Sequence, residues 1–422
     1  MAVTVVQQRT MTMLRSIDIF AGCGGLCDGF VQSGRYQTLA AVEWNEAPVN
    51  VLRKRLSDKW GMDDAEKRVI RFDVQRTDEL IRGWTGDEEY GSCDGLEKYI
   101  DGSLDVVIGG PPCQAYSIAG RVRDENGMRL DYRNYLFESY IRVIRHFEPK
   151  VFVFENVPGI LSARPGDGSF KIIDRIQTEF DRAGYAVLSD LSKAVVDMTE
   201  YGVPQNRKRI IILGLNKKYY GSSNKCEKIL DNFYTEILPS YKSGRVMTVR
   251  DAISDLPKLF PLEKDIRIDG HHLSHSLPEP PVDGHIPRYH SQRDIKIFRM
   301  LAEDILSGER KYESTEALKE LYTKVTGKVS NVHKYHVCEW DKPSNLIPAH
   351  LYKDGLRHIH PDSEQARTIT VREAARLQTF DDDFCFGNSM TEAYKMIGNA
   401  VPPLFAKKLA LAVSDMMEKY SK

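Results

Sequence analysis

One cysteine stands where a nucleophile could act. Residues 109–114 read Gly-Gly-Pro-Pro-Cys-Gln and follow an apolar run, 104–108, that is typical of a buried strand. An isolated cysteine is most often a small buried apolar residue. Here two prolines hold Cys113 rigidly after a strand, and open α/β sheets place their chemistry at the carboxyl ends of strands. The position therefore predicts a thiolate nucleophile.

A carboxylate follows one later apolar run, and two arginines precede another. Glu155 closes the run 151–154, where a carboxylate is costly unless it is hydrogen-bonded or transfers protons. Arg207 and Arg209 lie just before the run 210–212, so a strand that starts there puts both on one face. That face could steady an anionic group or a polarised carbonyl in the same cleft. A solvated basic turn is the alternative interpretation.

A glycine-rich turn and two acids indicate an adenosine-containing cofactor. The first strand leads into Phe20-Ala21-Gly22-Cys23-Gly24-Gly25, and glycines let a backbone turn tightly against a ligand. Alone, such a turn is as often structural as nucleotide-binding. Glu43 ends the next strand, near the spacing of about 20 residues at which an acid holds a ribose hydroxyl. Asp73, after the third strand, could receive an adenine amino group. Together they favour the cofactor over isolated surface caps.

These side chains need an α/β scaffold to position them. Apolar runs at 16–20, 38–42, 104–108, 150–154 and 209–213 have the length and β-branched content of buried parallel strands. Amphipathic stretches such as 134–147 separate several of them. The alternation predicts right-handed crossovers and a doubly wound, mostly parallel α/β sheet. Residues 57–102 contain more Gly, Asp and Glu than a crossover needs, which predicts an insertion there.

The strand and helix alternation ends near residue 216. Ten of the eleven histidines lie between His271 and His360, and the proline-rich stretch 271–289 is poor material for regular elements. One helix is expected at 294–306 and another from Pro403 onward. The pattern predicts a catalytic and cofactor-binding domain at 1–240, completed by 390–422. A smaller, largely irregular domain follows at 241–362, and 363–389 forms a returning hinge.

Composition excludes several classes of protein. The 422 residues include 59 Lys and Arg against 60 Asp and Glu, a net charge of −1. A globally basic nucleic-acid coat protein is excluded, although a local basic face is not. Seven cysteines without a CxxC pair indicate a reducing compartment. With no membrane-length apolar run and no signal-like start, we expect a soluble cytoplasmic protein without a membrane partner.

Six motifs, in this order, resemble the DNA cytosine carbon-5 methyltransferases, above all the bacterial restriction-modification type. They lie at 18–25, 109–114, 155–157, 205–209, 367–378 and 397–403. Pro-Cys-Gln and Glu-Asn-Val, followed near the end by Gly-Asn-Ala-Val, are jointly very specific. The resemblance is weakest at 57–103 and 216–330. It implies a Rossmann-like methyltransferase fold that uses S-adenosylmethionine, with a target-recognition domain at 241–362.

The resemblance also implies a mechanism. Cys113 adds to carbon 6 of a flipped-out cytosine, and Glu155 holds the ring at N3 and the exocyclic amine. Carbon 5 takes the methyl group of S-adenosylmethionine, leaving S-adenosylhomocysteine, and loss of the carbon-5 proton expels Cys113. Arg209, with Arg207 nearby, binds the base carbonyl and the adjacent backbone.

The resemblance further implies which residues bind the cofactor and the DNA. The cofactor set is Phe20, Gly22, Gly24, Glu43, Trp44, Asp73, Pro112, Leu136, Asn399 and Ala400. The expected DNA contacts are Gln114, Ser117, Arg288, Arg293 and Lys296. The implied partner is double-stranded DNA, with a cognate restriction endonuclease as a functional partner. The expected state is a monomer on the bacterial nucleoid.

Three alternatives compete with this interpretation, and zinc binding is an alternative role for four of the histidines. An enzyme of the same fold acting on transfer RNA typically carries Cys-Phe-Thr in its recognition region, and this chain has none. A non-catalytic DNA-binding relative is disfavoured because Cys113, Glu155 and Arg209 are all present. A dinucleotide oxidoreductase leaves the Pro-Pro-Cys loop unexplained. No metal is expected, because without cysteine pairs no standard zinc spacing is met by His271, His272, His275 and His285.

Overall fold

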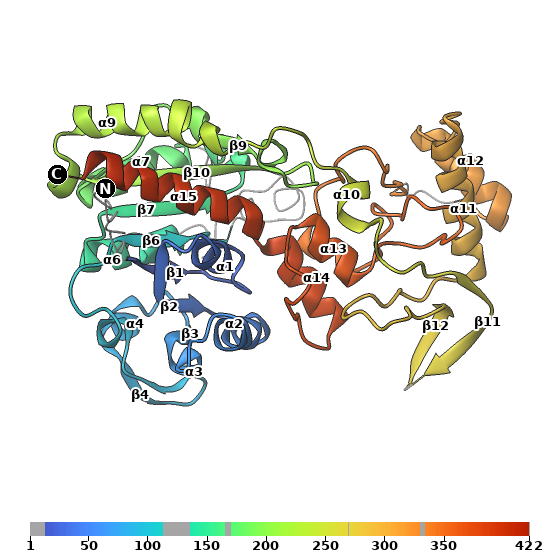
Figure 1. Ribbon diagram of the computed structural model, residues 1–422, viewed down its shortest axis with the longest axis horizontal. Coiled ribbons are helices and arrows are strands. Elements are labelled where there is room, and N and C mark those ends of the chain that lie inside the picture. The colour runs from blue at the N-terminus through green and yellow to red at the C-terminus, as the bar shows by residue number, and fades with distance from the viewer. Residues whose placement is uncertain (1–12, 113–135, 165–169, 269, 330–333, 422) are drawn as a thin grey trace, which may run out of the picture.

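The computed structural model describes residues 13–112, 136–164, 170–268, 270–329 and 334–421 (Figure 1). The molecule has two lobes, and helices α13 (Val371–Leu377) and α14 (Met390–Asn399) lie between them. Cys113, Gln114 and Ser117 lie outside the described residues.

The larger lobe is built on one eight-stranded sheet in the order β3-β2-β1-β6-β7-β10-β8, with β9 paired to β10. The strands are β1 (Leu14–Ile19), β2 (Tyr36–Glu43), β3 (Val69–Arg71), β6 (Val106–Gly109), β7 (Val151–Asn156), β8 (Tyr185–Ala186), β9 (Val195–Asp197) and β10 (Lys208–Asn216). Those from β3 to β7 pair in parallel, whereas β10 is antiparallel to its three neighbours. The predicted doubly wound, mostly parallel sheet is confirmed.

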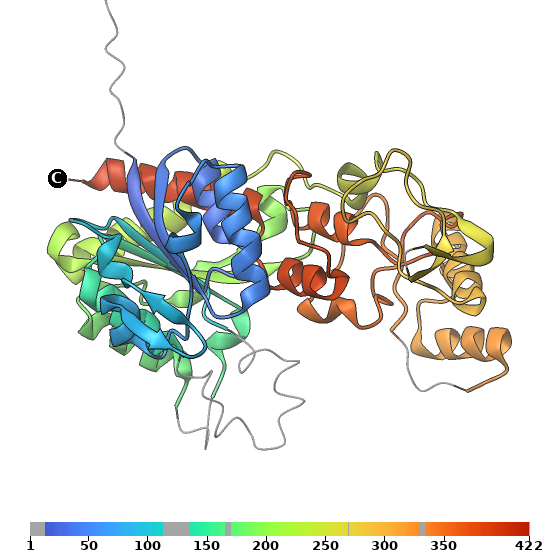
Figure 2. The same cartoon turned by 90° about the horizontal axis from the view of Figure 1, so that it is seen from below.

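Helices cover both faces of this sheet, which explains why its strands are almost continuously apolar. Figure 2 shows α1, α2 and α15 on one face and α6 and α7 on the other. The helices of this lobe are α1 (Gly25–Gln32), α2 (Glu46–Asp58), α3 (Ala65–Arg68), α4 (Thr77–Arg82), α6 (Leu136–Phe147), α7 (Ile172–Arg182), α8 (Lys217–Tyr220), α9 (Ser223–Asn232) and α15 (Pro403–Tyr420). Among the described residues, each helix is too short or too polar to cross a bilayer.

The insertion expected at 57–102 contains a small hairpin apart from the main sheet. Its strands are β4 (Trp84–Asp87) and β5 (Gly91–Cys93), and Figure 1 shows β4 beyond β3, the edge strand of the sheet. The rings of Phe72 and Trp84 stack with centroids 3.7 Å apart. This aromatic contact fixes the hairpin against the end of β3.

The last helix returns to the first. α15 begins at Pro403, as predicted, and its stripe of Phe405, Leu409, Ala412 and Met416 is fully buried. It packs on α1 so closely that a Cβ at Gly29 would lie 2.4 Å from the Cβ of Ala406. The Tyr36 hydroxyl donates to the Ala410 carbonyl at 3.0 Å. A late segment of the chain therefore completes the core of the larger lobe.

The smaller lobe is more regular than expected. It contains α10 (Val249–Ile253), β11 (Pro261–Ile268), β12 (His271–His275), α11 (Gln292–Ser307) and α12 (Thr315–Thr326). The helix predicted at 294–306 is confirmed. The prediction of irregular structure is wrong for His271–His275, because this segment pairs with β11, and His275 Nε2 lies 2.9 Å from the Gln365 carbonyl. Helix α12 was not predicted.

A buried polar network lies where the lobes meet. Arg367 donates to both carboxylate oxygens of Glu373, at 2.6 and 2.7 Å, and all of these side chains are buried. Thr370 and Glu373 form the capping box that starts α13. Although burial opposes it, the Arg367 guanidinium holds the pKa of Glu373 well below its ordinary value. The start of α13 is thus fixed by charge and by capping together.

Candidate active site

The candidate site lies at the point where the order of the sheet reverses. From β1, the strands β2 and β3 extend to one side and β6 and β7 to the other. Open α/β sheets bind their ligands at such a point, beyond the carboxyl ends of the strands. The register pairs Ile19 with Gly109 and Gly109 with Phe154. Three neighbouring strands therefore end at the same height in the sheet, and they lead into the glycine turn, the loop that begins at Gly110, and Glu155.

Two glycines allow this close approach. A Cβ at Gly109 would lie 2.3 Å from the Ile19 carbonyl oxygen, and one at Gly110 would lie 2.8 Å from Oε2 of Glu155. The buried Asn156 amide donates to the Pro111 carbonyl at 3.1 Å. The loop that leads to Cys113 therefore starts from a fixed position beside Glu155.

Glu155 and Arg209 form an ion pair at the floor of the site. Arg209 Nε lies 3.0 Å from Glu155 Oε1, and each side chain is 12% exposed. The antiparallel register places Ile211 opposite Glu155, so Arg209, two residues earlier, lies on the same face of the neighbouring strand. Because the pair is nearly desolvated, its electrostatic interaction is stronger than that of a surface pair.

The structure places Arg207 differently from the expectation that it shares this cleft. Its side chain is 1% exposed, and its Nη2 donates to the Ala400 carbonyl at 2.7 Å, with Gly398 also in reach. Arg207 therefore holds the turn at 398–400, and the guanidinium beside Glu155 is that of Arg209. The backbone carbonyls of a segment nearly 200 residues away account for the difference.

Two glutamines that the sequence analysis did not single out support the same turn. Gln378 Nε2 donates to the Ala400 carbonyl at 2.6 Å, and Gln205 Nε2 donates to Gln378 Oε1 at 2.5 Å. Both side chains are fully buried. Both glutamines lie inside motifs of the resemblance, at 205–209 and 367–378, and that was the signal available in the sequence.

The glycine turn after β1 is shaped to receive a ligand. Phe20, Gly22 and Gly24 have positive φ angles of 67°, 55° and 97°, and the space around Gly22 is open. Glu43 Oε2 accepts from the Gly22 amide at 3.1 Å, and its Oε1 accepts from the Asn45 amide at 2.8 Å. These bonds fix the Glu43 carboxylate at the end of β2.

The remaining cofactor candidates surround this turn or border the site. Trp44 is 50% exposed, and Asp73 Oδ1 accepts from the Gln75 amide at 3.0 Å. Leu136 is buried at the start of α6, Pro112 and Ala400 are half-buried, and Asn399 is exposed. A fixed acid, an open glycine turn and a half-exposed indole fit a ribose, a close backbone contact and an apolar ring.

Three ionisable side chains in or beside the turn are buried. Burial raises the pKa values of Asp18, Cys23 and Cys27 well above their ordinary values. Burial disfavours the thiolate forms of Cys23 and Cys27, so both side chains act as packing residues and not as nucleophiles.

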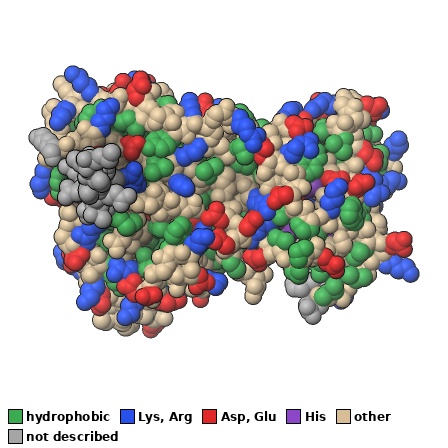
Figure 3. Space-filling view, in the orientation of Figure 1, with side chains coloured by type: hydrophobic (Ala, Val, Ile, Leu, Met, Phe, Trp, Pro, Cys, Tyr) green, Lys and Arg blue, Asp and Glu red, His purple; other side chains and the backbone are tan. Residues whose placement is uncertain are grey.

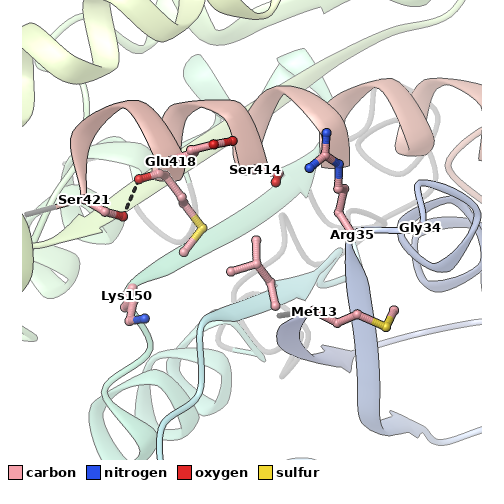
Figure 4. Close-up of a pocket in the computed structure, with 9 residues that line it drawn as sticks. Met13, Gly34, Arg35, Lys150, Ser414, Glu418 and Ser421 are labelled. Carbon is pink, nitrogen blue, oxygen red and sulfur yellow. Dashed lines mark hydrogen bonds between the residues drawn. The ribbon is translucent and has the colours of Figure 1, made fainter. Parts of the chain in front are cut away.

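A separate cavity of about 130 Å³ lies at the amino ends of the strands, on the side of the sheet opposite to the candidate site (Figure 4). Met13, just before β1, and Lys150, just before β7, line it with Glu418 of α15. These positions are at the amino ends of the strands, away from Glu155 and Glu43. The cavity is therefore not part of the candidate site.

The basic residues expected to contact DNA are only partly available. Arg288 donates to the carbonyls of Leu351 and Tyr352 at 2.6 and 2.7 Å and lies over the ring of Tyr394. Its guanidinium therefore supports the fold of the smaller lobe. Arg293 pairs with the adjacent Asp294 at 2.8 Å and keeps half of its side chain exposed, and Lys296 is exposed.

Buried histidines support the smaller lobe in the same way. His275 Nδ1 lies 3.0 Å from the Ser274 hydroxyl, and His285 contacts the Thr370 hydroxyl and the Pro257 carbonyl at 2.9 and 2.8 Å. Across the described part of the chain, no group of three or more His, Cys, Asp or Glu is placed to hold a metal ion.

Comparisons with known proteins agree with this geometry. The profile of the family described as C-5 cytosine-specific DNA methylase matches residues 14–415. The Type II methyltransferase M.Bpa9945I of Bacillus paralicheniformis is 39% identical over 332 residues, covering 75% of this chain and 71% of its own. The Type II methyltransferase M1.HphI of Haemophilus parahaemolyticus is 30% identical, covering 96% of this chain and 87% of its own.

Solved structures show the same fold. A prophage-encoded protein of E. coli superposes with a TM-score of 0.58 at 22% identity, over 96% of this chain and 99% of its own. The S. pombe Dnmt2 methyltransferase gives 0.51 at 15% identity, over 96% and 99%. The chain belongs to the C-5 cytosine-specific DNA methylases, enzymes that methylate carbon 5 of cytosine in DNA with S-adenosylmethionine as the methyl donor.

Proposed function

We propose that this chain methylates one cytosine within a short sequence of double-stranded DNA, with Cys113 as nucleophile and Glu155 as the group that holds the ring. The observation that carries the proposal is the Glu155–Arg209 pair, 3.0 Å apart, beside the glycines from which the Cys113 loop starts. The target base must leave the duplex to reach this floor, because it is inaccessible inside the helix.

The chemistry follows from the electronic structure of cytosine, whose carbon 5 is a weak nucleophile. The Cys113 thiolate forms a bond to carbon 6, and the displaced ring electrons collect at carbon 5 while Glu155 holds N3 and the amine. Arg209 polarises the base carbonyl and keeps Glu155 oriented. S-adenosylmethionine, when bound, supplies an electrophilic methyl group. Loss of the carbon-5 proton then returns electrons to the ring and releases the Cys113 thiolate.

The cofactor is proposed to lie across the glycine turn. Glu43, fixed by two backbone amides, would accept the ribose hydroxyls, and the half-exposed Trp44 would cover the adenosyl group. Asp73 would accept the adenine amine. The rest of the pocket would be lined by Phe20, Gly22, Gly24, Pro112, Leu136, Asn399 and Ala400.

The smaller lobe is proposed to select the DNA sequence. Residues 241–362 would read the duplex, 363–389 would act as the hinge, and 390–422 would complete the catalytic lobe. Arg293 and Lys296, with Gln114 and Ser117, remain candidates for DNA contacts. Arg288 would instead stabilise the fold of the smaller lobe through its hydrogen bonds to Leu351 and Tyr352. The names of the bacterial relatives support a restriction-modification role, and a cognate endonuclease is proposed as the functional partner. We propose a monomer working on nucleoid DNA in a bacterial cytoplasm.

Bisulfite sequencing tests this function directly. The chain and a Cys113→Ala variant would be expressed in a bacterial host that lacks DNA methylation. We expect protected cytosines within one short recurring sequence, and none with the variant. Complete conversion in a well-expressed sample would contradict a DNA substrate, and cellular RNA would then be sequenced in the same way.

A further inference from the structure

The hairpin β4–β5 reaches the residues that we propose bind the adenosyl group. Tyr90 lies in its turn, and the Tyr90 hydroxyl accepts a hydrogen bond from Nε1 of Trp44 at 3.0 Å. Trp44 directly follows Glu43 at the end of β2, and half of its surface is exposed. The exposed Trp44 side chain is therefore held by a hydrogen bond from its indole nitrogen to the insertion at 57–102, a segment that contains none of the six family motifs.

Tyr90 also contacts the end of the next strand. Its ring lies edge-on to Phe72 with centroids 5.0 Å apart, and Phe72 stacks on Trp84 of β4. Phe72 immediately precedes Asp73, the residue proposed for the adenine amine. One aromatic column therefore joins the hairpin to the ends of both β2 and β3.

Charged groups hold Tyr90 in this position. Asp87 Oδ1 accepts from the Tyr90 amide at 2.9 Å, and Asp87 pairs with Arg76 at 2.6 Å. Arg71 pairs with Glu89 at 3.1 Å, and its guanidinium lies 5.4 Å from the centre of the Tyr90 ring. The turn that presents the hydroxyl is thus fixed before any ligand arrives.

The Tyr90 hydroxyl is kept neutral. Burial raises the pKa of Tyr90, the hydrogen bond from the Trp44 indole lowers it in part, and the carboxylates of Glu89 and Asp73 raise it. The neutral hydroxyl oxygen accepts from the Trp44 indole.

We propose that Tyr90 is a positioning residue that fixes the Trp44 indole in the orientation that binds the adenosyl group of the cofactor. This inference rests on the proposed placement of the cofactor at Glu43 and Trp44. An exposed indole that rotates freely loses that freedom on binding, whereas one already held by Tyr90 does not. Ordering one such side chain corresponds to about three- to tenfold in affinity.

The test is Tyr90→Phe in the full chain, which removes the hydroxyl and keeps the aromatic column. We expect the Kd for S-adenosylhomocysteine, measured by calorimetry, to rise about three- to tenfold. The melting temperature, and kcat at saturating S-adenosylmethionine, should not change. Tyr99→Phe is the matched control, because Tyr99 is another half-buried tyrosine of the same insertion. Its affinity should equal that of the unmodified chain.

A double-mutant cycle separates positioning from a direct contact. If Tyr90 acts through Trp44, Tyr90→Phe has no further effect on Kd in a Trp44→Phe background. The inference is overturned if Tyr90→Phe changes Kd equally in the unmodified chain and in the Trp44→Phe variant, or if it does not change Kd in the unmodified chain. Glu43→Gln and Trp44→Phe test the placement itself. If both leave Kd unchanged, the proposed cofactor pocket fails; if both weaken binding and Tyr90→Phe does not, only the inference about Tyr90 fails.

Discussion

Replacing Glu155 by Gln isolates the role proposed for its carboxylate. The amide keeps the size of the side chain and can still accept from Arg209, but it cannot share a proton with N3 of the base. We expect kcat to fall about 10²- to 10⁴-fold while DNA affinity changes little. Single-turnover methylation assays measure the first quantity and fluorescence anisotropy the second.

Glu138→Gln provides the matched control for Glu155. Glu138 is a half-exposed carboxylate on α6 that pairs with Arg175 at 2.5 Å. Like Glu155 it forms an ion pair with an arginine, but it lies outside the candidate site. Its kcat should be that of the unmodified chain. An unchanged kcat in the Glu155 variant would remove the carboxylate from the mechanism.

Cys113→Ser should abolish turnover and leave cofactor binding intact. A serine hydroxyl ionises far less readily than a thiol, so addition to carbon 6 fails. The cofactor turn follows β1, whereas Cys113 follows β6, so calorimetry should give the same Kd for S-adenosylhomocysteine. Loss of that affinity in a folded variant would contradict this division of roles.

Side-chain identity predicted chemistry better than it predicted partners. The position of Glu155 at a strand end followed from one apolar run and one carboxylate. The roles of Arg207 and Arg288 could not be predicted in this way, because their partners are backbone carbonyls of distant segments. Arg207 donates to Ala400, and Arg288 donates to Leu351 and Tyr352. A sequence shows where a guanidinium stands, but its partner depends on the tertiary fold.

At the scale of elements, four buried histidines make the smaller lobe and its junction sensitive to acid. Burial lowers the pKa of His275 and His358 to about 4 and of His290 and His360 to about 3. The unfolded chain binds these protons near pH 6.5 and the folded chain does not, so acid favours unfolding. The free energy of unfolding should be constant above about pH 7 and fall as the pH drops towards 4.

Each of these histidines contributes a slope of up to about 1.4 kcal/mol per pH unit within that interval. Urea denaturation at several pH values measures the slope. His360→Gln should reduce it, because His360 is fully buried beside Arg367 and Glu373. A stability that is independent of pH between about 7 and 4 would contradict the neutral buried state.

Local patterns predicted elements that bury one face and missed those that depend on pairing. The apolar spacing of α11 and the prolines before α15 are visible in sequence and gave correct helices. β12 (His271–His275) was missed because all of its residues except Leu273 are polar, and it becomes a strand by pairing with β11 and by the burial of Leu273, Ser274 and His275. The hairpin that presents Tyr90 was foreseen only as an insertion.

At the scale of the whole molecule, DNA binding should depend steeply on salt although the net charge is −1. Figure 3 shows Lys and Arg interspersed with Asp and Glu on the face it presents, so overall charge does not drive association. Contacts to phosphates nevertheless release counterions, with a slope of about −0.9 per phosphate on logarithmic axes. Binding titrations across salt concentrations measure this slope, and a flat response would contradict a local basic cleft.

The packing of α15 on α1 also decides when this enzyme becomes active during its own synthesis. Residues 403–420 leave the ribosome after nearly all of the described chain, and until then α1 lacks the surface against which Gly29 and Tyr36 pack. The turn at 398–400, which Arg207 and Gln378 hold, is equally late. A nascent polypeptide therefore carries Cys113 long before it can shape the proposed cofactor pocket, and we expect it to gain methylating activity only after residues 403–420 have emerged and packed on α1.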